Sequence, residues 1–189
     1  MRARRASTVA GGVLLAVATV ASAGLPHACR PPPEVAQRLQ QACEVFDPVA
    51  PQAAVALWDA ALAQAAEPPA PSCRVVETAW QIGDFLKLHA RTSSDLALDY
   101  LNRGIAAHRP AAGTEDLPLA KLLKTAGHFF ARRGDRDRAC RSLAGAARVL
   151  GRLPEAEVSV LSGQIRDERS QNRCPGDEVS PGADPDQNR

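Results

Sequence analysis

The side chains in this sequence that could do chemistry are four histidines, five cysteines and three lysines. The other basic residues are twenty arginines. The histidines are isolated: no two have the i, i+4 spacing of a helical metal site, and the chain contains neither an HExxH nor a GxSxG motif. A catalytic role for Cys43 would require the fold to place it beside a histidine that is distant in the sequence. We therefore predict no catalytic residue, no metal site and no cofactor, and we do not expect an enzyme.

Basic side chains at helical spacing suggest a binding surface instead. One set shares a face because its members recur at steps of three and four residues: Lys121, Lys124, His128 and Arg132. A second set, upstream, does the same: Trp80, Asp84 and Lys87. Together they suggest a moderately basic surface with an aromatic anchor, suited to an acidic or carboxylate-ended peptide. An ordinary solvated face is the alternative.

The elements that must position these residues are helices. Apolar residues make up 45% of the chain and aromatic residues only 4%, with Ala the most frequent residue. This composition suits closely packed helices, because Ala has the highest helix propensity and adds little bulk. No segment alternates β-branched and polar residues as a strand would. Apolar spacing and breaks at Pro and Gly predict an all-α chain with helices near residues 34–46, 52–66, 73–89, 93–107, 117–132, 136–150 and 155–170.

The first six helices form three pairs that repeat at a nearly fixed interval. In the second helix of each pair a small residue follows a large one after three positions, at steps of 43 and 42 residues between pairs: Trp58 and Ala61, Leu101 and Gly104, Leu143 and Ala146. The best-formed pair has the pattern Gly127-x2-Phe130-x3-Gly134-x4-Ala139-x3-Leu143-x2-Ala146. This pattern resembles the tetratricopeptide repeat, with Gly134 in the turn.

The resemblance is good in the third pair, partial in the second and weak in the first. It implies a short solenoid of three antiparallel helix hairpins plus a C-terminal capping helix, in which the first helix of each pair lines a concave groove. The alternative is a generic helical bundle that contains one repeat-like hairpin. In the solenoid, the partner-binding residues would be those of the two basic faces: Trp80, Lys87, Lys121, Lys124, His128 and Arg132.

The cysteines are too widely spaced for a metal site built from paired ligands, and in an exported chain they are expected to form disulfides. Bridged Cα atoms must lie within about 7 Å. The helix plan places Cys29, before the first helix, at the same end as Cys73, which begins the parallel third helix. Cys140 and Cys174 also share an end. We predict the bridges Cys29–Cys73 and Cys140–Cys174, with Cys43 unpaired and buried.

The first 23 residues have the features of a signal peptide. Arg2, Arg4 and Arg5 precede an uncharged apolar run at residues 9–20, and Ala21-Ser22-Ala23 supplies the small residues of a cleavage site. A retained membrane anchor and a lipoprotein acylated at Cys29 are the alternatives. Cleavage removes three Arg and no acidic residue, so the formal net charge changes from +2 to −1. A nearly neutral chain gives no electrostatic reason to expect a nucleic-acid partner.

These features divide the chain into a signal peptide at residues 1–23, an extended lead-in at 24–33, a helical repeat domain at 34–171 and a disordered tail at 172–189. We expect a secreted or periplasmic protein with no membrane association beyond the signal peptide. Its expected function is to bind a protein or peptide, an acidic one among the candidates, through the groove. The alternatives are a structural, envelope-associated spacer and, less favoured, a small all-α enzyme or enzyme regulator.

Overall fold

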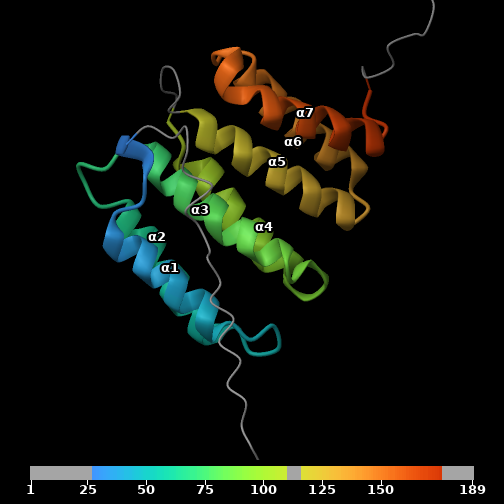
Figure 1. Ribbon diagram of the computed structural model, residues 1–189. Coiled ribbons are helices and arrows are strands. Elements are labelled where there is room, and N and C mark those ends of the chain that lie inside the picture. Colours follow the sequence, from blue (N-terminus) through green and yellow to red (C-terminus); the bar gives the residue numbers. More distant parts are fainter. Residues whose placement is uncertain (1–26, 110–115, 176–189) are drawn as a thin grey trace, which may run out of the picture.

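The computed structural model describes residues 27–109 and 116–175, and all regular structure in these ranges is helical (Figure 1). The all-α prediction is therefore confirmed for this part of the chain. The expected signal peptide, and the expected tail beyond residue 175, lie outside the described residues. The 3-10 helix η1 spans His27–Cys29, and the α-helices are α1 Pro33–Val45, α2 Gln52–Ala65, α3 Ser72–Lys87, α4 Ala90–Ala107, α5 Leu117–Arg132, α6 Arg136–Leu150 and α7 Glu155–Gln171.

Consecutive helices pack as three pairs, α1 with α2, α3 with α4 and α5 with α6. The pairs lie side by side in chain order: α3 contacts α2 and α5, and α5 also contacts α4. In Figure 1 the turns within the pairs lie at the lower right and the connections between pairs at the opposite end. Helix α7 follows α6 and contacts both α5 and α6. This packing is compatible with a short solenoid of hairpins.

Small residues permit the close contacts between these helices. A Cβ atom on Gly83 would lie 2.6 Å from Leu101, and one on Gly127 would lie 2.9 Å from Leu143, so the same Gly–Leu contact joins α3 to α4 and α5 to α6. Gly134 has φ +76°, a conformation that favours glycine, and forms the turn predicted for it. The large and small residues that define the repeat interval are all buried: Trp58, Ala61, Leu101, Gly104, Leu143 and Ala146.

Helix α7 ends the row of helices. Val158 and Ile165 are buried against the last hairpin, in one apolar cluster with Leu150. A Cβ atom on Gly163, by contrast, would meet nothing within 4 Å. Helix α7 thus buries one side and leaves the other to solvent, as the terminal element of a helical stack requires.

Both predicted disulfides are present. Cys29 pairs with Cys73 at a Cα–Cα distance of 5.1 Å, and Cys140 pairs with Cys174 at 5.3 Å. The second bridge is reinforced by Arg136, whose Nε donates a hydrogen bond to the carbonyl of Asn172 at 2.7 Å. The chain that follows α7 is therefore fixed to the start of α6.

Cys43 is unpaired, as predicted, but the prediction that it is buried was wrong. The apolar stripe of α1 consists of Val35, Leu39 and Ala42. Cys43 follows this stripe by one position, which rotates it about 100° around the helix. Its thiol is consequently half-buried on the flank of α1.

Two further segments differ from the prediction. The lead-in is not wholly extended, because His27–Cys29 forms η1, which packs against α3. Helix α4 begins at Ala90, three residues earlier than predicted, but Ser93 has non-helical dihedral angles (φ −124°, ψ 15°). A kink therefore stands where the helix was expected to start.

Within the described ranges, no helix has both the length and the hydropathy needed to span a bilayer.

Candidate functional site

The two predicted binding faces meet across the contact between α3 and α5. Trp80 Nε1 donates a hydrogen bond to Thr125 Oγ1 at 3.2 Å, and Lys121 Nζ lies 4.4 Å from the centroid of the Trp80 ring. An ammonium group over an indole ring is a favourable cation–π arrangement. We call the combined surface the α3–α5 face; its residues are Trp80, Asp84, Lys87, Lys121, Lys124, His128 and Arg132.

Each lysine of this face lies beside a carboxylate. Lys87 Nζ is 2.5 Å from Asp84 Oδ1, Lys121 Nζ is 3.7 Å from Glu77 Oε2, and Lys124 Nζ is 3.2 Å from Glu168 Oε1. The surface is therefore closer to charge balance than the lysine spacing predicts. In addition, Lys121 covers the ring of Trp80, so the ring is not a bare aromatic anchor.

Glu77 is the most deeply buried acid of the group, with no exposed surface. Gln81 Nε2 donates a hydrogen bond to Glu77 Oε1 at 3.1 Å. Burial raises the pKa of Glu77, and the ammonium of Lys121 partly opposes this rise; burial likewise lowers the pKa of Lys121. Glu77 is not among the residues predicted from the sequence, although a lone acid in the mostly apolar segment Val-Val-Glu-Thr-Ala indicates a buried carboxylate.

His128 marks the second half of the face, on α5. Burial is the main cause that lowers the pKa of its half-buried ring. The positive charges of Lys87, Arg132 and Lys124 lower the pKa further, while the carboxylate of Glu168 acts in the opposite direction. The charges of Lys87 from α3, of Lys124 and Arg132 from α5 and of Glu168 from α7 thus all act on His128.

Glu168 is likewise not among the residues predicted from the sequence. It comes from α7, and one of its oxygens is buried without a hydrogen-bond partner. Its only sequence signal is its place three residues after the buried Ile165, which turns it toward the protein. That signal does not show which helix it faces.

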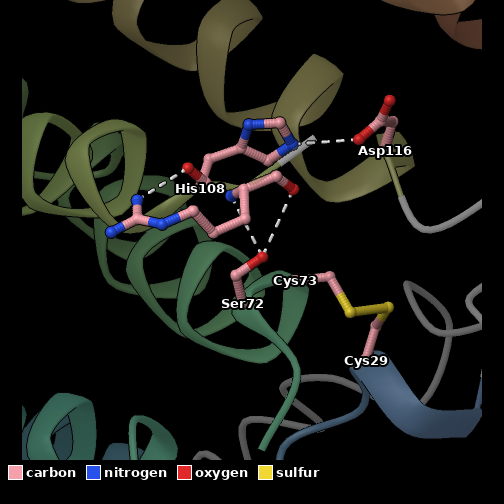
Figure 2. Close-up of polar contacts among 6 residues, drawn as sticks. Cys29, Ser72, Cys73, His108 and Asp116 are labelled. Atoms are coloured by element: carbon pink, nitrogen blue, oxygen red, sulfur yellow. Dashed lines mark hydrogen bonds and ion pairs between the residues drawn. A yellow bond between two sulfur atoms is a disulfide. The ribbon is translucent and has the colours of Figure 1, made fainter. Parts of the chain in front are cut away.

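A second polar cluster lies near the Cys29–Cys73 bridge (Figure 2). Ser72 Oγ accepts a hydrogen bond from the backbone N–H of Arg109 at 3.1 Å, and His108 Nε2 lies 2.9 Å from Asp116 Oδ1. These contacts join the start of α3 to the end of α4, and the end of α4 to the residue that precedes α5.

The types Ser, His and Asp match a hydrolase triad, but the arrangement does not. In Figure 2 the ring nitrogen of His108 that does not face Asp116 points away from Ser72. The hydroxyl of Ser72 is engaged by the backbone of Arg109 instead. A triad needs the histidine to bridge the other two residues. These residues instead connect the start of α3, the end of α4 and the residue that precedes α5.

Two further observations concern the rest of the described chain. Among residues 27–109 and 116–175, no three His, Cys, Asp or Glu side chains are grouped so that they could hold a metal ion. An open groove of about 430 Å³ lies between α6 and α7, lined by Leu150, Val158 and Ile165 among others. This groove does not include any residue of the α3–α5 face.

Comparison of the chain with models of known protein families, with curated proteins and with solved structures finds no match.

Proposed function

We propose that the protein binds a protein or peptide partner through the α3–α5 face. The observation that carries the proposal is that the two predicted faces contact each other. Lys121 on α5 lies over the ring of Trp80 on α3. The charges of Lys87, Lys124 and Arg132 act together on His128. Stacked helical hairpins commonly present such surfaces to extended partners. The resemblance of residues 117–150 to a tetratricopeptide repeat supports the same function.

We further propose that the protein is exported and acts in the periplasm or outside the cell. Two disulfides in a small helical chain are typical of an oxidising compartment, since cytosolic thiols are kept reduced. The first 23 residues supply the features of a signal peptide.

Site-specific photo-crosslinking tests the binding function. A photoreactive residue at Arg132, which is exposed at the end of α5, should crosslink to a partner in the native compartment. The matched control places the same group at Arg148, which is exposed on α6. The partner identified by crosslinking should then be purified, and it should bind this protein directly. Identical crosslinks from both positions, or none from Arg132, would contradict the proposal.

A structural spacer is the second candidate, and one observation favours it. The lysines of the α3–α5 face have acidic partners within the protein, so the surface is stable without a ligand. For a spacer, reversing the charge of Lys124 or removing Trp80 should leave the function in the cell intact as long as the fold is retained. For a binding module, the same variants should lose it.

A further inference from the structure

We propose that Lys87, Lys124, His128 and Arg132 form a carboxylate-binding subsite within the α3–α5 face, and that it takes an aspartate or glutamate side chain of the partner. The inference rests on the proposed function, because it names the chemistry that the same face would recognise.

This cluster already holds one carboxylate. Lys124 Nζ lies 3.2 Å from Glu168 Oε1, and the two side chains are only 16% and 23% exposed. Charges shielded from water interact more strongly than charges at a fully exposed surface. The site therefore offers an acidic group a partly desolvated surface, and Glu168 shows where such a group fits.

The cluster also has a surplus of positive charge. The charged groups that act on the His128 ring are Lys87 from α3, Lys124 and Arg132 from α5, and Glu168 from α7. Lys87 also has Asp84 beside it. Three positive groups against two carboxylates leave one positive charge when His128 is neutral and two when it is protonated. A partner carboxylate would reduce this repulsion, whereas a basic partner would increase it.

The arrangement links binding to protonation. Burial and the neighbouring cations lower the pKa of His128, while the nearby carboxylate of Glu168 acts to raise it. A second carboxylate, supplied by the partner, should raise the pKa of His128 in the same direction as Glu168. Binding should then take up protons and strengthen as the pH falls from about 7.5 to about 6.

The test uses the full oxidised protein and capped, amidated peptides of Glu and Ala as the probe, with Gln–Ala peptides of equal length as the control. Calorimetry at both pH values gives the affinity, and NMR titration of the imidazole gives the pKa of His128. We expect the Glu peptide alone to bind with a higher affinity at the lower pH and to raise the pKa of His128. A Gln peptide with a free C-terminal carboxylate tests the other source of this group; if it binds as well as the Glu peptide, the assignment to a side chain is overturned.

Two variants with opposite expected effects separate recognition from stability. Arg132→Gln should weaken binding of the Glu peptide by up to about fivefold, the range for one exposed charge pair, while Arg141→Gln on α6 should not. Glu168→Gln should tighten binding, because it removes the competing carboxylate. Equal binding of Glu and Gln peptides, or an unchanged pKa of His128 at saturation, would overturn the subsite. A partner crosslinked at Arg132 would in that case still support the proposed function.

Discussion

Alanine substitutions at four helical glycines test the stacking of the hairpins directly. Gly104 on α4 lies where α3 and α5 meet: a Cβ atom there would be 2.5 Å from Leu122 Cδ1 and 2.7 Å from Ala79 Cβ. Gly163 on α7 has nothing within 4 Å of the same atom. The same Gly→Ala change should therefore have opposite effects on the free energy of unfolding in the two helices.

The expected sizes follow from two opposing contributions. Replacing Gly by Ala in a helix interior stabilises the fold by up to about 1 kcal/mol, because Ala has the higher helix propensity. At Gly163 this gain should appear unopposed. At Gly104 the Cβ of Ala79 cannot move without its helix, and overpacking a core costs about 1–3 kcal/mol. Gly104→Ala should therefore lower the free energy of unfolding by up to about 2 kcal/mol. Because the propensity gain is common to both variants, the contrast with Gly163→Ala should equal the overpacking cost, about 1–3 kcal/mol.

Urea unfolding of the oxidised variants, followed by circular dichroism, measures this contrast. Gly83→Ala and Gly127→Ala should also lower stability, because Leu101 and Leu143 lie 2.6 Å and 2.9 Å from the added atom and both leucines are buried. A contrast of 2 kcal/mol corresponds to about 4–8 °C in Tm for a chain of this size. If Gly104→Ala proved as stable as Gly163→Ala, the close packing of α4 between α3 and α5 would be refuted.

Three further outcomes are expected. Replacing both Cys140 and Cys174 by Ser should lower the free energy of unfolding by about 2–4 kcal/mol in urea titrations; an unchanged midpoint would contradict this. Alkylation of Cys43, followed by mass spectrometry, should be far slower in the native than in the unfolded protein, because burial, followed by the charge of Glu44, raises its pKa to about 11; equal rates would count against it. The pKa of His128 is lower in the folded than in the unfolded chain, so acidification through about pH 6.5 should destabilise the fold. Chemical unfolding across that range should show a slope that His128→Gln reduces, and equal slopes would show that another group is responsible.

Local signals in the sequence were sufficient for the helices and the disulfides. Pro, Gly and apolar spacing placed most helix ends within one or two residues of those observed. The Cys29–Cys73 bridge followed from placing α1 and α3 parallel, one hairpin apart. The start of α4 was harder to predict from the sequence, because the kink at Ser93 interrupts the helical dihedral angles without ending the helix.

The candidate site could be predicted only in part. Spacing within one helix correctly placed Asp84 next to Lys87, because residues three or four apart are neighbours on a helix. The carboxylates beside Lys121 and Lys124 come from other helices, so their pairing depends on how α3 and α7 pack against α5. The sequence therefore shows where the cations lie but not how far they are neutralised.

Helix α7 links the stability of the stack to the charge of the candidate site. Burying Ile165 against the last hairpin fixes the rotation of α7, and Glu168, one turn further along, consequently faces Lys124 on α5. The Cys140–Cys174 bridge holds the chain just beyond α7, which restricts movement of that end of the helix. Loosening this bridge should therefore remove a carboxylate from the surroundings of His128 as well as destabilise the fold. The helix that closes the row of hairpins is thus also the one that sets how strongly the α3–α5 face attracts an acidic group.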